Sequence, residues 1–392
     1  MNTDIQPSQD RDVSATCNST PSSTPSSTPS STSSSTPSFT SSTKDTNITN
    51  NVKAYYGSVL DTNEDLKTSA CCPSEAPPPH IQALLNNIHP AVQEKFYGCG
   101  SPLPVAAEGC TILDLGCGSG RDVYLLSQLV GNRGEVIGID MTEEQLTVAR
   151  DHIDWHTEKF GYESPNVRFK QGYIEDLTSI GIKDDSVDII ISNCAINLSP
   201  NKEAVFKEIF RVLKPGGELF FSDVFADRRI PEKLQLNPTL LGECLGGALY
   251  LGDFQRLMEK VGLSDSRIIS QRELTIDDPD IKAMAGMITF YSMTVRAFKL
   301  NLDESRENFA QVARYLGTIA ECPDAFVLDA DLQFATEEPV PICSNTAMML
   351  SKTRLAKHFK VHGDCAIHYG AFNPSPKPET DINLEQPTTG CC

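Results

Sequence analysis

The chain has 392 residues, of which 39% are hydrophobic, and its 52 acidic residues against 33 basic ones give a formal net charge of −19. This length and apolar content suffice for two or three domains with sizeable cores. The negative charge disfavours nucleic acids and anionic membrane surfaces as partners, because both would be repelled. The sequence contains no apolar run as long as a membrane span, and we expect no secretory signal after Met1.

Residues 1–48 form a tract rich in Ser, Thr and Pro, in which Thr-Pro-Ser-Ser recurs. Such a segment buries too little apolar surface to offset the entropy lost on ordering, so we expect it to be disordered. An organelle transit peptide would also be rich in serine, but it would carry several arginines and avoid acids, whereas this tract has only Arg11 among several aspartates. We therefore expect a cytoplasmic protein, whose thirteen cysteines are kept reduced.

A lead-in segment connects the tract to the first strand, and residues 80–97 within it are predicted to form a helix. From residue 111 onward, short apolar runs alternate with helical patterns, which is typical of an α/β fold with a doubly wound, Rossmann-like sheet. The seven predicted strands are 111–115, 135–139, 167–170, 187–192, 218–224, 266–274 and 288–299. The predicted helices begin after Gly120 and Thr142, and cover 202–213 and parts of 239–262. Residues 301–392 form a poorly patterned appendage.

The turn after the first predicted strand carries the strongest functional signal. It reads Asp114-Leu-Gly-Cys-Gly-Ser-Gly120, and Arg121 stands where a dinucleotide-binding loop has its third glycine. An acid at position 114 would repel a phosphate but suits a cofactor with a cationic amino-acid end. S-adenosylmethionine (SAM) has an ammonium and a sulfonium group and no phosphate. A tight turn without a ligand is the alternative interpretation.

The second predicted strand ends at Asp140, where a carboxylate can accept hydrogen bonds from both hydroxyls of a ribose. The next residues, Thr142-Glu-Glu-Gln145, match a capping box at the start of a helix. The acid at the end of this strand strengthens the prediction of a cofactor that contains a nucleoside.

Three cysteines are predicted to approach the same crevice. Cys194 follows the fourth predicted strand, Cys244 lies in a glycine-rich segment after the fifth, and Cys99 is flanked by glycines at the end of the lead-in helix. Ligands of an open parallel sheet bind beyond the carboxyl ends of its strands. Taken singly, each cysteine also fits a buried core position. Three thiolates around one centre would instead select a soft, thiophilic ion.

Several segments of the chain are more specific than the glycine loop. They read Tyr55-Tyr-Gly-x-Val-Leu60, Lys67-Thr-Ser-Ala-Cys71, Tyr97-Gly-Cys-Gly100, Gly138-Ile-Asp-Met141, Gly172-Tyr-Ile-Glu175, Ser192-Asn-Cys-Ala-Ile-Asn197 and Gly242-Glu-Cys-Leu-Gly-Gly-Ala-Leu-Tyr250. Together with the glycine loop, they closely resemble the arsenite methyltransferases. The resemblance covers about residues 52–300. It implies a SAM-dependent methyltransferase domain over 49–300, with a cysteine-bearing N-terminal lead-in and an arsenic-binding insertion around 225–262. Residues 301–392, beyond the resemblance, are expected to form a C-terminal domain with a Cys-Cys tail.

The resemblance also implies roles for single cysteines. Those matching Cys99, Cys194 and Cys244 hold trivalent arsenic, and the one matching Cys71, next to the additional Cys72, takes part in redox turnover through a disulfide. The implied substrates are arsenite and methylarsenite, and the implied role is arsenic detoxification. Thioredoxin or glutathione would reset the disulfide. We expect a cytoplasmic monomer without a nucleic-acid or membrane partner.

The predicted cofactor contacts follow the motifs in chain order. They are Asp114, Gly116, Cys117 and Gly118 at the methionine end, Asp140 at the ribose, Met141 at the adenine face, Ile174 and Glu175 at the adenine edge, and Asn193 beneath the sulfonium. Packing alone also explains Cys117. Tyr56 either closes over the pocket or stacks on the core.

Two other functions match parts of this pattern. A carbon methyltransferase that acts on a quinone or sterol shares the sheet and the Lys214-Pro-Gly-Gly217 turn, but it needs a general base and has no use for three thiols. A metalloid sink would bind arsenite without turnover, and the acids at the predicted cofactor site argue against it. The terminal Cys391-Cys392 pair either carries arsenite on a flexible tail, is prenylated, or is idle, and it is not the usual C-a-a-X signal.

Overall fold

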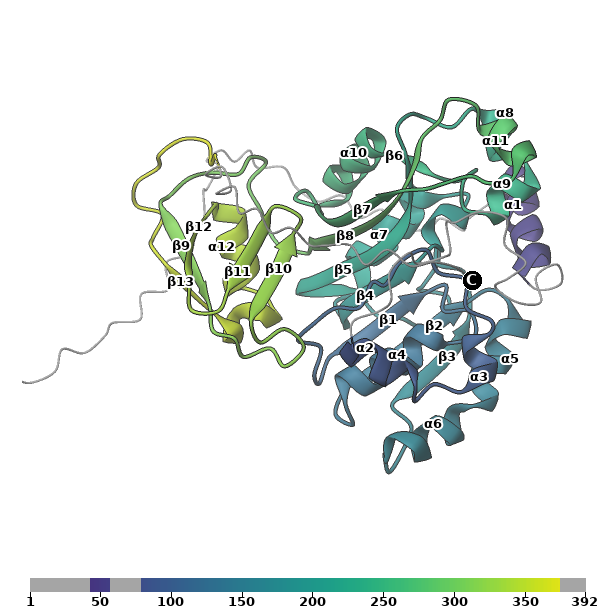
Figure 1. Ribbon diagram of the computed structural model, residues 1–392, viewed down its shortest axis with the longest axis horizontal. Helices are drawn as coiled ribbons and strands as arrows, with labels where there is room; N and C mark the ends of the chain where they lie inside the picture. Colours follow the sequence, from purple (N-terminus) through teal and green to yellow (C-terminus); the bar gives the residue numbers. More distant parts are fainter. Residues whose placement is uncertain (1–42, 57–78, 374–392) are drawn as a thin grey trace, which may run out of the picture.

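The computed structural model describes residues 43–56 and 79–373, and its largest element is one twisted sheet (Figure 1). The path of the sheet is β3-β2-β1-β4-β5-β8-β7, and a two-residue strand, β6, pairs with β5. The strands are β1 (Thr111–Leu115), β2 (Glu135–Asp140), β3 (Val167–Gln171), β4 (Val187–Asn193), β5 (Leu213–Ala226), β6 (Leu249–Tyr250), β7 (Arg267–Glu273) and β8 (Phe290–Phe298). The expected seven-stranded fold is therefore confirmed, with β6 as an addition.

The strand directions position the site. The strands β1 to β5 pair in parallel, whereas β8 runs antiparallel between β5 and β7. The carboxyl ends of the five parallel strands therefore gather at one edge of the sheet. The loops after β1, β2 and β4 meet at this edge, which is where an open parallel sheet binds its ligands.

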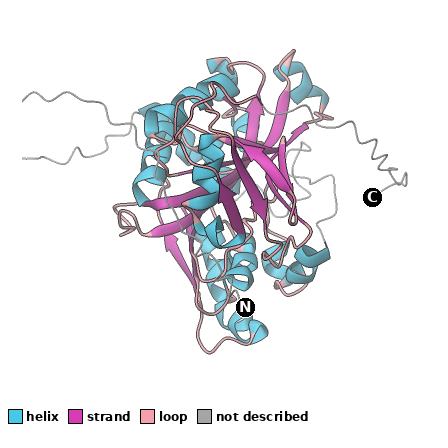
Figure 2. Ribbon diagram, turned by 90° about the vertical axis from the view of Figure 1, so that its left-hand side faces the viewer, coloured by secondary structure: helices cyan, strands magenta, loops and turns pink. Residues whose placement is uncertain are grey.

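Helices cover both faces of the sheet (Figure 2). They are α4 (Arg121–Val130), α5 (Glu143–Asp151), α6 (Ile153–Phe160), α7 (Lys202–Val212) and α10 (Leu251–Val261). Because successive side chains of a strand point to opposite faces, Ile112 shares a core with Val123 of α4, whereas Leu113 shares one with Phe206 of α7. None of the helices within the described residues combines the length and the apolar character that a membrane span needs.

The lead-in segment differs from the expected single helix over 80–97. It contains α2 (Pro79–Leu85) and the short α3 (Pro90–Gln93), with a turn between them. Proline cannot continue a helix but fits its first turn, and the side chain of His89 accepts a hydrogen bond from the N–H of Ala91 there. The prediction of one helix was wrong because Pro90 interrupts it. The chain beyond Gln93 is irregular.

The N-terminal helix α1 (Thr43–Ala54) starts before residue 48, the expected end of the disordered tract. Its side chain Val52 is 1% exposed, and α1 lies against α9 (Pro238–Gly242) of the insertion. The predicted boundary was therefore wrong, because tertiary contacts order a segment whose composition alone favours disorder. Residues 1–42 of the expected tail over 1–48 and the Cys391-Cys392 end lie outside the described residues.

The insertion after β5 contains short helices. They are α8 (Glu232–Gln235) and α9, and α11 (Pro279–Ala285) follows β7. Side chains from these helices form a separate apolar cluster over the carboxyl edge of the sheet. Cys99, Cys194 and Cys244 all belong to this cluster, together with residues such as Leu240 and Ile281.

The C-terminal residues form a small domain rather than an unpatterned appendage, and it lies beside the sheet in Figure 1. A hairpin joins β10 (Ala325–Asp329) to β11 (Leu332–Ala335), and a three-stranded sheet has the order β12-β9-β13. The other elements are β9 (Gln311–Tyr315), β12 (Pro339–Ile342), β13 (Phe359–His362) and α12 (Ser344–Ser351). Its own apolar core includes Tyr315 and Phe334, which are fully buried.

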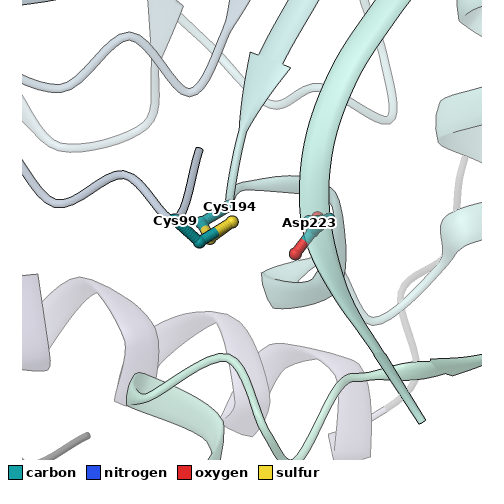
Figure 3. A group of neighbouring side chains, drawn as sticks. All are labelled: Cys99, Cys194 and Asp223. Carbon is teal, nitrogen blue, oxygen red and sulfur yellow. A yellow bond between two sulfur atoms is a disulfide. The ribbon is translucent and has the colours of Figure 1, made fainter. Parts of the chain in front are cut away.

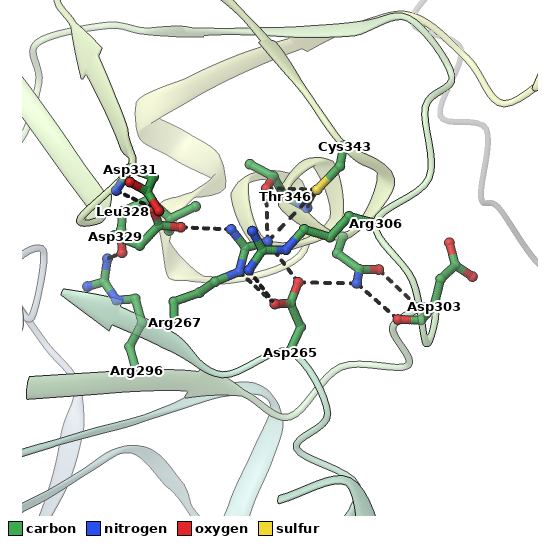
Figure 4. A network of polar contacts seen from close by, with 11 residues as sticks. Asp265, Arg267, Arg296, Asp303, Arg306, Leu328, Asp329, Asp331, Cys343 and Thr346 are labelled. Atoms are coloured by element: carbon green, nitrogen blue, oxygen red, sulfur yellow. Dashed lines mark hydrogen bonds and ion pairs between the residues drawn. The ribbon is translucent and has the colours of Figure 1, made fainter. Parts of the chain in front are cut away.

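Buried ion pairs connect this domain to the sheet. Arg267 of β7 lies between Asp265 and Asp329, at 2.7 Å from each carboxylate, and also donates to the hydroxyl of Thr346 (Figure 4). Nearby, Glu218 of β5 is 0% exposed, accepts a hydrogen bond from Arg296 and forms an ion pair with Arg354. A buried charge without its partner costs several kcal/mol, on the order of 3–5. These pairs therefore hold the two domains in one arrangement.

Candidate functional site

A pocket opens at the carboxyl ends of β1, β2 and β4. It encloses about 1000 Å³, including the part that is open to solvent. All nine predicted cofactor residues line it: Asp114, Gly116, Cys117, Gly118, Asp140, Met141, Ile174, Glu175 and Asn193. The strand order brings these short motifs together, although they are spread over about eighty residues of the chain.

The glycine loop has a geometry that only glycine permits. Gly116 has a φ of +79°, and a Cβ atom at this position would lie 2.2 Å from the Cβ of Ala195 in the turn after β4. The N–H groups of Gly116 and Cys117 both donate to the carbonyl of Ile139 in β2. The loop therefore packs closely between its two neighbouring strands and leaves the pocket open above it.

Asp140 is held between two backbone donors at the end of β2. Its carboxylate accepts hydrogen bonds from the N–H of Gly118 at 2.9 Å and from the N–H of Thr142 at 2.8 Å. Burial raises the pKa of Asp140, and these two donors oppose the rise. The predicted capping box is not formed, because Thr142 makes no side-chain cap and the side chain of Gln145 donates to the carbonyl of Tyr56 instead.

Acidic groups crowd the methionine end of the predicted cofactor site. Burial raises the pKa of Asp114 well above its usual range, and the neighbouring carboxyls of Asp122 and Asp140 raise it further. Asp114 is 2% exposed. Three carboxyl groups in one pocket repel an anion and attract a cation, so the pocket fits a ligand with an ammonium group and no phosphate.

Asn193 ties the lead-in segment to the end of β4. Its side-chain amide donates to the carbonyl of Gly100 at 2.9 Å and to the carboxylate of Asp122 at 3.0 Å, and its oxygen accepts from the N–H of Gly100. Gly98 is close enough that an added Cβ would meet the Asn193 amide at 2.5 Å. The residue thus also orients the segment that carries Cys99.

Two further predicted residues have clear packing partners. Cys117 belongs to an apolar core beneath the loop, and burial raises the pKa of its thiol well above the usual range. The thiol is therefore neutral, which agrees with its interpretation as a packing residue. Glu175 accepts a hydrogen bond from the hydroxyl of Ser199 at 2.5 Å, which joins the rim of the pocket to the turn after β4.

Most residues that line one side of the pocket were not predicted from the sequence. The lining also includes Thr49 and Val52 of α1, Tyr56, Gln145, Ser199, and the lead-in residues Lys95, Phe96 and Tyr97. Of these, Tyr56 was expected either to close over the pocket or to stack on the core, Tyr97 stood in a segment that carries the family resemblance, and Gln145 was assigned to a capping box. The others lie far from the glycine loop in the chain, and no local spacing connects them to it.

The three predicted thiols lie in one apolar cluster beside the pocket. Cys99 and Cys194 are joined as a disulfide with Cα atoms 5.8 Å apart, and both are 2% exposed. Cys244 keeps its thiol, which donates to the carbonyl of Cys194 at 3.3 Å. The hydroxyl of Tyr56 lies 3.9 Å from the Cys244 sulfur and donates to the carbonyl of Gly242.

The disulfide departs from the expectation that the thiols are all reduced, and it pairs two of the predicted arsenic ligands with each other. Their side chains face one another across the edge of the sheet, which allows the bond to form. A thiol must be deprotonated and unbonded to bind a soft ion, so this pair has to be reduced first. Cys365 is also disulfide-bonded, whereas Cys71 and Cys72 lie outside the described residues.

The backbone at two of these cysteines is strained. Cys194 has a φ of +59° and Cys244 a φ of +61°, in the left-handed region that residues other than glycine rarely adopt. Such backbone conformations cluster at functional sites, where contacts with the surrounding structure hold the strained residue in place. Here the strain turns both side chains toward the same cluster.

A carboxylate that the sequence analysis did not single out also reaches the disulfide. A carboxyl oxygen of Asp223 in β5 and the sulfurs of Cys99 and Cys194 all lie within 4.8 Å of one another (Figure 3). Burial raises the pKa of Asp223 to about 7, against the effect of three backbone donors and of Lys202. Burial lowers the pKa of Lys202 to about 8, and its ammonium donates to the carbonyls of Asn197 and Ser199.

Two families match the chain by sequence profile. One, described as a methyltransferase domain, matches residues 106–262, and the other, described as the arsenite methyltransferase C-terminal domain, matches residues 308–382. The second match covers the small domain that begins near β9, for which the sequence analysis offered no pattern.

Curated proteins and solved structures give the same indication. An arsenite methyltransferase of Aquipseudomonas alcaligenes is 48% identical over 322 residues, which are 82% of this chain and 92% of the relative. An arsenite methyltransferase of Mus musculus is 44% identical over 80% of this chain and 83% of its own. The crystal structure of an arsenic(III) S-adenosylmethionine methyltransferase from Chlamydomonas reinhardtii has 47% identity and a TM-score of 0.73, and covers 76% of this chain and 100% of that chain.

Proposed function

This chain belongs to the arsenite methyltransferase family. On that premise, we propose which part of the reaction its thiols perform and which part its pocket performs. The protein is a SAM-dependent methyltransferase that acts on arsenite. In its reduced form, Cys99, Cys194 and Cys244 hold the arsenic. The pocket beside them holds the methyl donor.

The pocket fits SAM on the chemistry of its residues. The buried carboxyls of Asp114 and Asp122 suit the ammonium group, and Asp140 is fixed by two backbone donors where it can accept the ribose hydroxyls. When bound, SAM supplies an electrophilic methyl group on a sulfonium. Met141 and Ile174 provide the apolar contact for the adenine, beside Glu175.

One observation carries the proposal. Cys194 lines the cofactor pocket and at the same time belongs to the thiol cluster. An arsenic atom bound to Cys194 therefore lies at the boundary between the two sites. Neither the glycine loop nor the three thiols would alone distinguish methylation of arsenic from methylation of carbon or from storage of arsenite.

Arsenite capture needs no general base. Neutral arsenous acid exchanges its three hydroxyl groups for three thiols and releases three molecules of water, so that charge and protons balance. The arsenic keeps its lone pair and has no proton to lose, so the protein contributes chiefly by positioning it toward the methyl group. The apolar residues of the cluster, such as Leu240 and Leu245, exclude water from the bound arsenic.

The pairing of Cys99 with Cys194 supports a redox step at the same centre. Methylation oxidises arsenic formally from the trivalent to the pentavalent state. If the two sulfurs then join as a disulfide, they return two electrons to the arsenic, one water adds to it and one proton leaves. Methylarsenic(III) then remains on Cys244 with one hydroxyl group, ready for another round.

The disulfide has to be reset before the next capture. Both cysteines are only 2% exposed, which restricts direct access of thioredoxin or glutathione from solution. We assign the relay to Cys71, as the family resemblance implies, with an external thiol reductant as the final electron source. A reducing cytoplasm supplies such reductants, and detoxification of arsenic is the cellular role that this chemistry would serve.

The test is incubation of the purified full-length enzyme with arsenite, SAM and a thioredoxin system, followed by separation of the arsenic species. We expect methylarsenite and further methylated products from the wild-type enzyme and none from Cys194→Ser. Cys322→Ser, which changes a thiol of the C-terminal domain, serves as the control and should retain activity. Retention of unmethylated arsenite despite bound SAM would show a sink, and methylation of a quinone in place of arsenite would show a carbon methyltransferase.

The redox step has its own test. A single turnover without reductant should leave the Cys99–Cys194 disulfide in a peptide digest, at one disulfide for each methyl group transferred. Free thiols at both positions after turnover would contradict the assignment of this pair.

A further inference from the structure

Asp223 has no place in the mechanism described so far, yet it reaches the arsenic site. It lies in β5 and is 2% exposed, and one of its carboxyl oxygens lies within 4.8 Å of the sulfurs of Cys99 and Cys194. Figure 3 shows its side chain on the strand beside the disulfide. The burial of a carboxyl group next to two sulfurs needs an explanation, because it costs free energy unless the group is paired.

The backbone partners of Asp223 favour the charged carboxylate, against the burial that raises its pKa to about 7. The N–H of Asn197 donates to one oxygen at 3.0 Å, and the N–H of Val224 donates to the other at 2.9 Å. An ionised carboxylate is an acceptor at both oxygens, so N–H donors on each side suit the charged form. The ammonium of Lys202 adds an attractive field from the start of α7.

A negative charge at this place does not help the capture of arsenite. A carboxylate beside two thiols opposes their ionisation, since like charges would come close together. The complex of arsenic with three thiolates is neutral, so it does not need a counter-charge. The negative charge of Asp223 therefore has its effect at a later stage of the reaction, after arsenite has bound.

That later state is cationic. When the arsenic lone pair attacks the methyl group, an As–C bond forms, the C–S bond breaks and its electron pair goes to the sulfur of the donor. The positive charge of the sulfonium thereby passes to the arsenic, which becomes a methylarsonium held by three thiolates. Its charge develops on an arsenic bound to Cys99 and Cys194, whose sulfurs lie within 4.8 Å of a carboxyl oxygen of Asp223.

We propose that the Asp223 carboxylate stabilises the positive charge that develops on arsenic during methyl transfer. This inference rests on the proposed function, in which Cys99 and Cys194 are arsenic ligands. Fixed charges aimed at charge that develops in a transition state are effective because they need no reorganisation. The backbone donors and β5 hold the carboxylate in place before the reaction begins.

The simpler alternative is that Asp223 only caps the turn after β4. Its oxygen accepts the N–H of Asn197 in the 3-10 helix Ile196–Leu198, and an aspartate that only capped this turn would affect stability and ligand binding. A counter-charge instead affects the rate of methyl transfer once both substrates are bound. The two roles are therefore separated by comparing binding with single-turnover rate.

The experiment compares the full-length wild-type enzyme with Asp223→Asn, after reduction and loading with arsenite. Single-turnover methyl transfer at saturating SAM should fall by about 100-fold, the order expected for removal of one preorganised electrostatic group. The dissociation constants for arsenite and for SAM should change by less than about threefold, because neither bound ground state needs the charge. Equal loss in the rate and in arsenite affinity would overturn the proposal in favour of a cap.

Asp188→Asn is the matched control. Asp188 also lies in the sheet and accepts a backbone N–H, from Thr111 at 2.8 Å, but it stands at the start of β4, away from the thiols. Asp188→Asn should leave the single-turnover rate within about twofold of the wild-type rate, since no catalytic group contacts Asp188. A fall as large as that of Asp223→Asn would show a general effect of lost carboxylates and would contradict the proposal.

A second variant keeps the test decisive if Asp223→Asn does not fold. Asp223→Glu retains the charge in a longer side chain, so its single-turnover rate should stay within about tenfold of the wild type. A folded Asp223→Glu that binds both substrates but has lost methyl transfer entirely would contradict the proposal. Wild-type enzyme that fails to methylate arsenite would instead refute the proposed function itself.

Discussion

The cofactor pocket and the thiol site share Cys194 but are assembled in different ways. The pocket takes most of its predicted contacts from three motifs that each follow directly on a strand of one sheet. The thiol site joins Cys99, Cys194 and Cys244 from the lead-in segment, the turn after β4 and the insertion, with Cys99 and Cys194 separated by 95 residues and Cys194 and Cys244 by 50. The predicted contacts at the strand ends depend chiefly on the sheet, whereas a site made of three segments depends on every contact that brings them together.

The largest expected effect comes from substitutions that remove a thiol of the arsenic site and leave the cofactor pocket intact. Cys194→Ser and Cys244→Ser should each abolish methylation of arsenite and of methylarsenite, since both residues lie on the cofactor domain and serve every round. The loss should exceed the roughly 10- to 100-fold that changes around a metal ligand cause. Arsenic speciation after incubation with SAM and a thiol measures it.

Cys99→Ser and Cys71→Ser separate the lead-in thiols from that pair. Methylarsenite has only two positions left for thiols, so both variants should still methylate it in a single turnover. Sustained methylation of arsenite should be lost, because Cys99 completes the three-thiol site and Cys71 resets the disulfide. Full methylation of arsenite by Cys244→Ser would show that the three-thiol arrangement is not needed.

The next effect concerns stability on the cofactor side. His156 is 1% exposed, and its ring stacks on that of Tyr124 with the ring centroids 3.6 Å apart. It also accepts a hydrogen bond from the N–H of His89, and this bond anchors the lead-in segment. Burial lowers the pKa of His156 to about 4 from its ordinary value near 6.5. Below pH 6.5 the unfolded chain therefore takes up a proton that the folded protein does not.

The contribution of His156 to stability should thus be complete above about pH 6.5 and disappear as the pH falls toward about 4, at a cost of about 3 kcal/mol at most. Denaturant unfolding at several pH values measures it in the wild type and in His156→Phe. The phenylalanine variant keeps a ring for stacking, so its stability should vary less with pH in this window. An identical pH dependence in both proteins would contradict the assignment to His156.

A smaller effect tests the pocket by itself. Asp140→Ala removes the carboxylate that accepts two backbone N–H groups and, in our proposal, the ribose hydroxyls. SAM affinity should fall by roughly tenfold or more, because hydrogen bonds to a charged group contribute about 1.5–3 kcal/mol each. Equilibrium dialysis with arsenite should give an unchanged dissociation constant, and an unchanged SAM affinity would show that Asp140 does not contact the cofactor.

The smallest effect concerns the N-terminus. Deletion of residues 1–42 should leave the melting temperature and the activity unchanged, because the Ser/Thr/Pro tract offers little apolar surface to bury. Deletion of residues 1–56 should lower SAM affinity, since it removes Val52 and Tyr56 from the pocket and the contact of Tyr56 with Cys244. Equal behaviour of both deletions would mean that α1 serves neither site.

Much of the cofactor side was predictable because its signals are local. The apolar run before Asp114 and the glycines after it indicate a strand, a turn and a cofactor, and the acid at Asp140 marks the next strand end. The prediction failed where one residue overrides a pattern, as Pro90 does in the expected helix over 80–97. It also failed at Thr142, because Asp140 takes the N–H of Thr142 and the side chain of Gln145 bonds to Tyr56 instead.

The thiol side was predictable only in part. The three cysteines were identified by their flanking glycines and by family resemblance, yet the bond between Cys99 and Cys194 and the presence of Asp223 were not. Both depend on distances across the sheet between segments that are far apart in the chain. The positive φ angles at Cys194 and Cys244 belong to the same class, because a sequence pattern rarely indicates left-handed backbone at a residue other than glycine.

The sequence by itself determined the order of the seven long strands of the main sheet, the glycine loop, the acids that meet a cationic cofactor and the identity of the candidate thiols. It could do so because periodicity, turn residues and charge act over a few neighbouring positions. The tertiary structure alone decided which of those thiols pair, which carboxylate stands beside them, and that α1 and the lead-in segment wall the pocket. These features depend on packing between distant segments, where burial changes the free energy of a charge or a thiol and no local pattern records it.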